Sequence, residues 1–319
     1  MTDDRRRLYY KQNRLKQLRA FCFAAQSGSI SRAAESMFLS QPSISLLIKA
    51  LEKDLKEPLF ERKGPKIKLT KEGSILLDLA LPLVEGLESL PEALSERCNN
   101  TVSGELNIAA GESTIMYILP KIIKQFKTAF PQIRVQLNNV TGRDGLTMLR
   151  AGEVDFAVGS MLNVPDDIIY IPTLTYDPVL ITPLDHALAG KVDVTIEDIG
   201  PYGLILPPRH LSTWRMVQLV FQQHRVDFKV ALEAGGWEVI KKYVEMGLGV
   251  SIVTSICLSE DDNLASIPLN KYFPQRNYGI VVRRGKILTP AARGFFELVN
   301  RQLLEKFYAL TDKNSVDVA

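Results

Sequence analysis

The chain has 319 residues, enough for about two domains of ordinary size. Hydrophobic residues make up 46% of the chain and charged residues 24%, proportions that exclude collagen-like, low-complexity and disordered proteins. No apolar run reaches the roughly 18 residues of a membrane-spanning helix. The charged start of the chain lacks the apolar core of a signal peptide, so we expect a cytoplasmic protein without a membrane partner.

Cysteines and histidines do not form the pattern of a metal, redox or catalytic site. His186, His210 and His224 lack metal-ligand spacing, and no HExxH, GxSxG, Walker or GxGxxG motif is present. The sequence therefore predicts no metal, no cofactor and no catalytic residue. The three cysteines are far apart, form no CxxC pair and are expected to be small buried or half-buried thiols: Cys22, Cys98 and Cys257.

Charge is unevenly distributed along the chain. Residues 1–70 contain 15 Lys and Arg against 7 Asp and Glu, a net charge of +8, whereas the whole chain has a net charge of +3. A basic end on a more acidic body favours a polyanion-binding module at the N-terminus. A solvated basic face without a partner explains the charge equally well, so the charge alone does not distinguish these two interpretations.

The first part of the chain is predicted to form three helices. Apolar residues recur at helical spacing over 15–25, a short helix follows over 32–38, and Ser40 can cap a third helix with Pro42 in its first turn. Two helices joined by a short break, the second capped and apolar on one face, describe a helix-turn-helix. The alternative is a plain three-helix bundle with a basic face.

In a helix-turn-helix the second helix enters the DNA major groove by its N-terminal end. Gln41 is placed there and can read adenine through two hydrogen bonds. With Ile44 facing the core, Lys49 and Lys53 face outward, where lysines suit phosphates. Leu46 also faces outward, towards a thymine methyl rather than a hydrogen-bonding base edge.

A compact hairpin follows these helices. Strand-like runs over 59–62 and 66–70 flank Lys63-Gly64-Pro65, where Gly-Pro marks the turn. Its basic residues give the hairpin the form of a wing that lies along the DNA backbone or minor groove. The candidate DNA-contacting residues are Ser29, Ser31, Arg32, Ser40, Gln41, Pro42, Ser43, Ser45, Leu46, Lys49, Lys53, Arg62, Lys63, Lys66 and Lys68.

A linker and an α/β region complete the chain. Thr70 begins a helical segment with leucines at coiled-coil-like spacing, which Pro82 and Pro91 should kink or break. Strands and helices then alternate from residue 105, which predicts a parallel sheet and two small lobes. The expected parts are a flexible basic extension over 1–14, a winged helix-turn-helix over 15–70, a linker helix over 71–99, a sensor over 103–310 (lobe I about 103–162 and 268–310, lobe II about 163–267) and a tail over 311–319.

These residues resemble the LysR-type transcriptional regulators. The matching strings keep the order and spacing of the family signature: L-x-x-L-x-x-F at 15–21, S-G-S-I-S-R-A-A-E at 27–35, S-Q-P-S-I-S at 40–45, L-F-E-R at 59–62 and L-T-K-E-G at 69–73. Less specific matches extend the resemblance to about residue 308. It implies a winged helix-turn-helix, a dimerising linker helix, and a periplasmic-binding-protein-like sensor with an effector cleft between two lobes.

The chain departs from the family pattern at four places. Lys56 replaces the usual glycine at the end of the recognition helix, and Leu46 stands where a polar residue is common. Pro82 and Pro91 disturb the expected linker helix. The extension before residue 15 is longer than usual for the family.

The resemblance also implies a small, often anionic effector. Helix N-termini suit such a ligand because they present free N–H groups and partial positive charge. Each serine or threonine can instead be a plain helix cap, and Glu112 either favours an amine or faces away. The candidate effector-binding residues at three helix starts are Gly111, Ser113, Thr114, Thr141, Gly142, Arg143, Arg209, His210, Ser212 and Thr213.

We therefore predict a transcription regulator without catalytic activity. Its expected partners are double-stranded DNA with dyad-symmetric operators, a small-molecule effector, a second copy or three further copies of the chain, and RNA polymerase. Effector binding is expected to shift the arrangement of lobes or subunits and so the spacing of the DNA-reading heads. The alternatives are a solute-binding protein or enzyme built on the sensor fold, and an architectural DNA-binding protein that responds to no effector.

Overall fold

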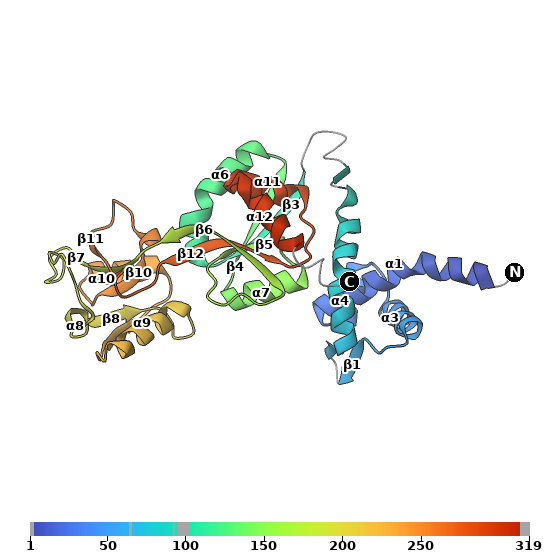
Figure 1. Cartoon of the computed structure of the whole chain (residues 1–319), viewed down its shortest axis with the longest axis horizontal. Coiled ribbons are helices and arrows are strands. Elements are labelled where there is room, and N and C mark those ends of the chain that lie inside the picture. The colour runs from blue at the N-terminus through green and yellow to red at the C-terminus, as the bar shows by residue number, and fades with distance from the viewer. Residues whose placement is uncertain (1–2, 64–65, 92, 95–102, 313–319) are drawn as a thin grey trace.

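The computed structural model describes residues 3–63, 66–91, 93–94 and 103–312. Figure 1 shows an elongated molecule with three parts in a row: an N-terminal head (residues 3–94), lobe I in the middle and lobe II at the opposite end. Every helix within the described ranges is too short or too polar to cross a bilayer.

Three helices form the core of the head: α1 (Asp3–Ser27), α2 (Ile30–Ser36) and α3 (Gln41–Leu55). The predicted caps are present, since the Ser29 hydroxyl accepts from the Arg32 amide and the Ser40 hydroxyl from the Ser43 amide. Ala33 and Ala34 of α2 are buried, and their small side chains allow the neighbouring helices to pack closely. Leu39, in the turn before α3, is 41% exposed.

The extension before residue 15 differs from the prediction. We expected a flexible tail over residues 1–14, but α1 already begins at Asp3. Half of its 14 residues are good helix formers, namely four Arg, one Lys, one Gln and one Leu. Extending an existing helix adds one hydrogen bond per residue without a new nucleation cost, so these residues join α1 although they lack an apolar period.

The predicted wing is present. Strands β1 (Phe60–Lys63) and β2 (Lys66–Leu69) pair antiparallel, with Phe60 opposite Leu69. Helix α4 (Lys71–Glu88) follows and is capped by the Thr70 hydroxyl. It continues through Pro82, so the proline does not break the helix as the sequence suggested it could. Residues 95–99 of the predicted linker lie outside the described ranges.

Lobe I is built on a five-stranded sheet in the order β4-β3-β5-β12-β6. Strand β3 pairs in parallel with β4 and β5, as the βαβ pattern predicted, and β12 pairs antiparallel with β5 and β6. The strands are β3 (Gly104–Ala110), β4 (Ile133–Asn139), β5 (Phe156–Gly159), β6 (Ile168–Tyr176) and β12 (Arg276–Arg283).

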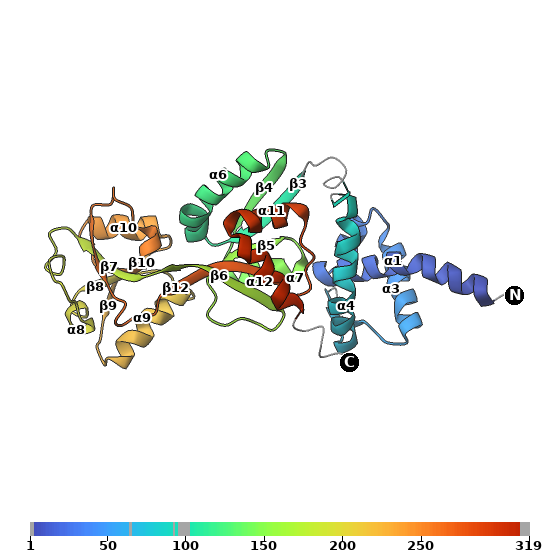
Figure 2. The same ribbon diagram turned by 45° about the horizontal axis from the view of Figure 1, so that its top comes forward.

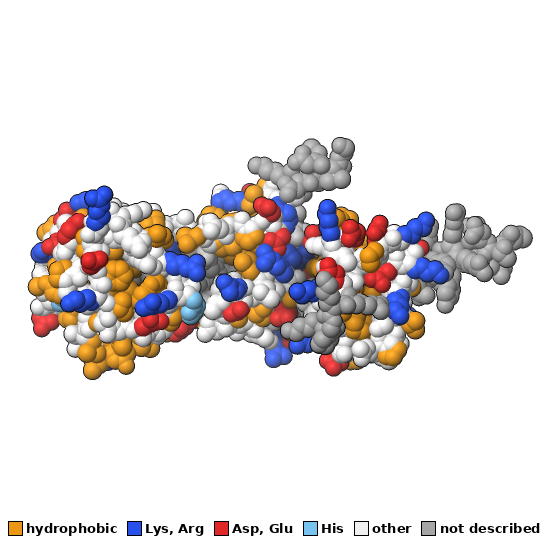
Figure 3. Space-filling view, turned by 90° about the horizontal axis from the view of Figure 1, so that it is seen from below, with side chains coloured by type: hydrophobic (Ala, Val, Ile, Leu, Met, Phe, Trp, Pro, Cys, Tyr) orange, Lys and Arg blue, Asp and Glu red, His pale blue; other side chains and the backbone are white. Residues whose placement is uncertain are grey.

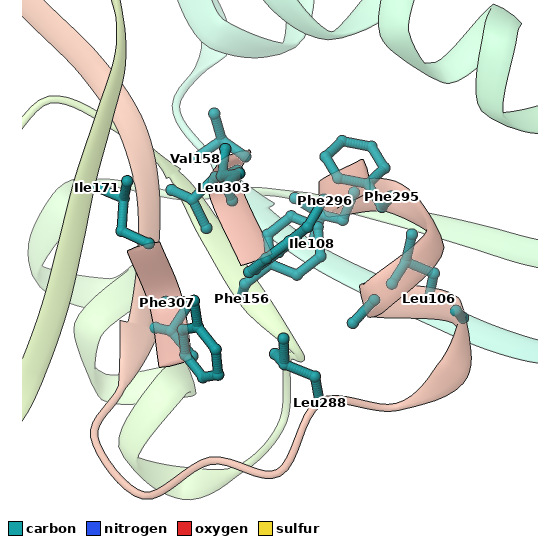
Figure 4. Packing of buried hydrophobic residues seen from close by; sticks show 14 of the residues in the cluster. Leu106, Ile108, Phe156, Val158, Ile171, Leu288, Phe295, Phe296, Leu303 and Phe307 are labelled. Carbon is teal, nitrogen blue, oxygen red and sulfur yellow. The ribbon is translucent and has the colours of Figure 1, made fainter. Parts of the chain in front are cut away.

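Helices cover this sheet and close the core of lobe I. They are the π-helical turn η1 (Thr114–Ile118), α6 (Leu119–Ala129), α7 (Gly142–Ala151), α11 (Pro290–Val299) and α12 (Arg301–Asp312). Figure 4 shows the aromatic centre of the core, where Phe156 of β5 meets Phe295 and Phe296 of α11 at ring-centroid distances of 5.0 and 5.1 Å. Such pairs add stabilisation beyond simple burial.

Lobe II contains two small sheets. Strands β7 (Pro178–Pro183), β10 (Ser251–Thr254) and β11 (Leu264–Pro268) form an antiparallel sheet, and β8 (Gly203–Leu206) pairs in parallel with β9 (Lys229–Glu233). The helical elements are α8 (Ile196–Ile199), α9 (Ser212–Gln223), α10 (Trp237–Glu245) and the 3-10 turn η2 (Ser255–Cys257).

The borders between the lobes differ from the prediction. Strand β6, which we placed in lobe II, pairs with β12 in the sheet of lobe I, and its Ile169 and Ile171 belong to the lobe I core. Conversely, Leu269 and Phe273 are buried in the core of lobe II. Continuous apolar strands look alike in both lobes, so only their pairing partners could assign them.

A buried ion pair joins the head to lobe I. Figure 2 shows α4 beside lobe I, and α1 also contacts α7 of lobe I. The Glu85 carboxylate of α4 accepts a hydrogen bond from Arg283 at the end of β12 at 2.7 Å, and Lys286 lies 3.6 Å away. The Arg283 and Glu85 side chains are only 9% and 15% exposed. A Cβ atom at Gly86 would lie 2.7 Å from Ile287, so the helix also approaches lobe I closely.

Replacing Glu85 should loosen this contact. Glu85→Gln leaves the buried Arg283 without its counter-ion, a change that typically costs about 3–5 kcal/mol. We expect the variant to unfold at a lower urea concentration, or in two transitions as head and sensor separate. The matched control is Glu88→Gln, which removes an exposed pair with Arg19 worth about 0–1 kcal/mol. Equal effects of the two substitutions would show that the Glu85 contact does not hold the parts together.

The altered cap of α3 leads to a second prediction. Lys56 adopts the left-handed conformation with φ of 61°, which costs a residue with a Cβ about 1–2 kcal/mol relative to the right-handed region. Lys56→Gly should therefore stabilise the head by about 1 kcal/mol, measured by urea unfolding. Lys56→Ala keeps the strain and should give no gain. A glycine variant no more stable than the alanine variant would contradict this explanation.

Candidate DNA-binding surface and effector cleft

Helix α3 separates an apolar face from a solvent face. Ile44, Ile48 and Leu51 are buried against the rest of the head. Gln41 at the start of the helix is exposed, and Leu46 is 67% exposed. The solvent face also carries Pro42, Lys49 and Lys53. The predicted base-reading and phosphate-binding positions therefore lie together on one accessible side of α3.

The remaining predicted contacts flank this helix. Ser31 and Arg32 of α2 are exposed, as is Lys68 of the wing. Ser29 and Ser40 already act as helix caps, and the half-buried Ser43 lies 2.8 Å from Ser40 between their hydroxyl oxygens. Ser45 is half-buried. The wing side chains that lie outside the described set are Arg62, Lys63 and Lys66.

Phe38 is a surface feature that sequence reasoning missed. It occupies the turn between α2 and α3 with φ of 53° and is 96% exposed. Positive φ is uncommon for a bulky residue, and an aromatic ring gains nothing from full exposure. The sequence signal that could have revealed this exposed ring is an apolar residue at the turn of a helix-turn-helix, where Asn or Gly would fit the backbone better.

The first predicted effector segment, on lobe I, starts at η1. Ser113 is half-buried and its hydroxyl makes no capping hydrogen bond, so it remains available as a donor or acceptor. Thr114 is 2% exposed. The irregular π turn itself is a feature often found at functional sites. Glu112 is exposed and lies close to lobe II, since a Cβ atom at Gly236 would be 3.0 Å from its carboxylate.

The second predicted segment, at the start of α7, is a helix cap. The Thr141 hydroxyl accepts a hydrogen bond from the Asp144 amide and donates to the Asp144 carboxylate at 2.7 Å. Gly142 and Arg143 are exposed. Thr141 therefore has the common structural role of a helix cap.

Side chains of lobe I and lobe II meet beside η1. The Tyr117 hydroxyl of η1 donates to Glu238 of α10, and burial raises the pKa of Tyr117 so that it remains a donor. Lys241, 6% exposed, bonds Glu238, Asp262 and a backbone carbonyl. Burial acts to lower the Lys241 pKa, but these hydrogen bonds raise it, so the lysine stays charged in the network.

The third predicted segment, before and at the start of α9, is organised by an arginine that the sequence did not reveal. Arg276 of β12 donates to Thr213 at 2.7 Å and also to Ser212. Arg209 is 77% exposed, lies over the Trp214 ring at 5.1 Å and approaches Glu233. His210 is exposed.

A cavity of about 130 Å³ lies between the lobes. Thr213 is the one predicted effector residue on its wall, and Arg276 also lines it. The full lining is Ser160, Met161, Leu162, Pro178, Thr213, Met216, Val217, Ile252, Val253, Thr254, Phe273, Pro274, Gln275, Arg276 and Asn277. A second cavity, of about 480 Å³, is lined by residues of lobe II alone, among them His186 and Tyr202. Of these two cavities, the smaller one is lined by residues of both lobes.

The described part of the chain contains no cluster of three side chains able to hold a metal ion. Cys22 and Cys257 are free and buried, and burial raises the pKa of each thiol to about 12. Thiols with such a pKa are unreactive at neutral pH. Cys98 lies outside the described ranges.

Two family models match the chain. Residues 15–74 match the bacterial regulatory helix-turn-helix proteins of the lysR family, and residues 99–304 match the LysR substrate binding domain. A probable RuBisCO transcriptional regulator of Gracilaria tenuistipitata var. liui is 31% identical over 290 residues, which cover 88% of this chain and 94% of that protein.

Solved structures agree with this fold. A full-length OxyR variant from Pseudomonas aeruginosa has a TM-score of 0.68 at 23% identity and covers 91% of this chain and 94% of its own. The Synechocystis CcmR regulatory domain in complex with 2-PG has a TM-score of 0.57 at 25% identity and covers 62% of this chain and 96% of its own.

The predicted fold and the predicted role in transcription are thus confirmed, and the enzyme alternative is not supported. The chain belongs to the LysR family of DNA-binding transcriptional regulators.

Proposed function

We propose that this regulator binds dyad-symmetric operators as a homo-oligomer and responds to a small anionic metabolite in the cleft between its lobes. It acts in the cytoplasm, where its DNA lies, and its effector changes the arrangement of the DNA-binding heads. RNA polymerase is the partner whose access to the promoter changes. The observation that carries the proposal is a DNA-reading helix and an interlobe cavity connected through one continuous set of contacts.

The surface of α3 supports specific DNA recognition. Gln41 is exposed at the N-terminal end, where a recognition helix meets base edges. Lys49 and Lys53 lie exposed further along the helix, in reach of phosphates that position the protein without reading sequence. Because a glutamine can discriminate adenine from other bases, this surface favours a regulator over a non-specific architectural protein.

Two exposed apolar surfaces support self-association. One is a stripe of side chains on α4 spaced four residues apart, with exposed fractions of 52% for Ile75, 67% for Leu79, 64% for Leu83 and 45% for Leu87. Helices bearing such a stripe pair readily, and a two-fold pair presents two heads to a dyad. Figure 3 shows further hydrophobic side chains gathered on lobe II, which suits a second contact between dimers.

Strand β12 supports a route from effector to DNA. It begins with Arg276 on the cavity wall and ends with Arg283 in the ion pair with Glu85 of α4. Eight residues of extended strand span about 24 Å, and pairing with β5 and β6 on both sides makes the strand stiff. A ligand that moves the lobes therefore acts on the helix that carries the head.

Replacing Gln41 tests the assignment of the base-reading surface. Gln41→Ala should weaken binding to the specific operator by about 1–3 kcal/mol and leave binding to random DNA nearly unchanged. Operators selected by the wild-type chain provide the specific target, and fluorescence anisotropy gives both affinities. Gln125→Ala on exposed α6 is the matched control and should change neither. Equal losses on both DNAs would favour the architectural alternative.

Charging the α4 stripe tests the oligomer. Leu83→Lys places a charge in the proposed dimer contact and should produce monomers at micromolar concentration, measured by analytical ultracentrifugation. Operator affinity should fall because only one head then binds each half-site. Leu219→Lys on exposed α9 is the control for an added surface charge. A dimer that survives Leu83→Lys with unchanged operator affinity would place the dimer contact elsewhere.

A further inference from the structure

Arg276 stands at the boundary of the two lobes. It is half-buried at the start of β12 and forms no ion pair with any residue that the structure describes. Arg283, at the other end of the same strand, is paired with Glu85. A partly desolvated charge without a counter-ion is unfavourable, so an anion that is not part of this chain would stabilise Arg276.

The guanidinium is held in place by neutral groups. One terminal nitrogen donates to the Thr213 hydroxyl at 2.7 Å and the other to the Ser212 hydroxyl. Neither partner neutralises its charge. The Nε atom is enclosed by protein and has no hydrogen-bond partner among the described residues. The Nε atoms of Arg19 and Arg283 are enclosed in the same way although both arginines have carboxylate partners, so Arg276 differs from them in lacking a counter-ion among the described residues rather than in this atom.

The start of α9 adds further donors beside Arg276. Leu211 is the capping residue of this helix and supplies no side-chain acceptor. The first N–H groups of a helix lack internal partners, and they carry partial positive charge. Ser212 and Thr213 already bond the guanidinium. Arginine, two hydroxyls and a helix N-terminus therefore converge at one place.

Both Arg276 and Thr213 line the interlobe cavity of about 130 Å³. An apolar cavity of about 150 Å³ is known to admit benzene, so this space suits a ligand of roughly six heavy atoms or the anionic end of a longer one. The remaining wall includes Met161, Met216 and Phe273, which exclude water and strengthen a charge-assisted hydrogen bond.

The first predicted effector segment does not line this cavity. Glu112 and Ser113 precede η1, with Glu112 exposed, and Thr114 is buried, but the cavity wall includes none of them. Ser160, Met161 and Leu162, which follow β5 of lobe I, line it instead. Arg276 is therefore the one charged side chain on the described wall.

We propose that Arg276, Ser212, Thr213 and the N-terminus of α9, hereafter the Arg276 cluster, bind the oxyanion group of the effector, a carboxylate or a phosphate. The proposal rests on the proposed effector cleft and assigns its anionic end to the place where β12 of lobe I meets α9 of lobe II. Arginine suits both groups because its planar fork donates two parallel hydrogen bonds. Neutral side chains of the wall, such as Ser160 and Asn277, then contact the rest of the ligand.

The test uses the full chain and two probes, inorganic phosphate and malonate, titrated at constant ionic strength. Binding is followed through the NMR signal of the Arg276 Nε–H, assigned by its loss in Arg276→Gln, and by calorimetry. We expect saturable shifts with at least one probe, which also identifies the preferred oxyanion. Arg276→Gln should weaken binding about tenfold or more, and Arg276→Lys should bind between wild type and Arg276→Gln because it keeps charge without the fork.

Arg209→Gln is the matched control, because Arg209 is one of the two arginines that the sequence placed in the site. It should change affinity by no more than about twofold. Melting curves identify variants that fail to fold, and the double variant Ser212→Ala with Thr213→Val then tests the cluster without touching Arg276. The proposal is overturned if neither probe binds saturably, or if Arg209→Gln loses affinity while Arg276→Gln does not.

Operator binding of the same samples without probe separates this inference from the function on which it rests. Specific operator binding by the wild-type chain, together with lost anion binding in Arg276→Gln, supports the cluster. If the wild-type chain binds its operator and Arg276→Gln does not change anion affinity, the Arg276 cluster is rejected but the proposed function is not. Failure of the wild-type chain to bind any DNA specifically would reject the proposed function instead.

Discussion

The buried contact between Glu85 and Arg283 is the interaction on which the arrangement of this molecule depends. It ties α4, and with it the DNA-binding head, to the last residue of β12. Close approaches of Gly86 to Ile287 and of Gly152 to Gln26 surround it, so the ion pair lies within a packed contact between the head and lobe I. Removing one partner of a buried pair leaves an uncompensated charge, so the structure favours keeping both parts docked as one body.

Strand β12 connects this ion pair to the cavity between the lobes. Its first residue, Arg276, lies at the interlobe cavity, and its last, Arg283, binds the linker helix. Arg276 is the one charged side chain among the described residues that line this cavity. A ligand with an anionic end therefore has one favoured orientation. Because interfaces between packed elements switch between discrete arrangements rather than bending freely, binding at one end of β12 can bias the position of α4 at the other.

Much of the fold could be predicted from the sequence because its determinants are local. Caps such as Ser40, the two strands of the wing and the apolar strand runs of the sensor appear within a few residues, and the structure confirms them. The helical extension of α1 and the place of β6 were missed. Helix propagation from a neighbour leaves no pattern of its own, and the sheet to which an apolar strand belongs is decided by distant partners.

The candidate site was harder to predict for the same reason. Ser212 and Thr213 were found from their place at a helix start, but their partner Arg276 is 63 residues away from Thr213 and belongs to no motif. Thr141 matched the same local pattern and is a cap. A helix start alone thus cannot separate a ligand contact from a cap, whereas an unpaired charge brought to it by the fold can.

Capture of sheared genomic DNA by the full-length protein at near-physiological salt, followed by sequencing of the bound fragments, tests the central claim most directly. The account predicts a few strongly enriched fragments that share a dyad with half-sites about one helical turn apart, or a multiple of it. Uniform recovery of all fragments, or no recovery, would contradict a sequence-specific regulator whose paired heads are positioned by the sensor.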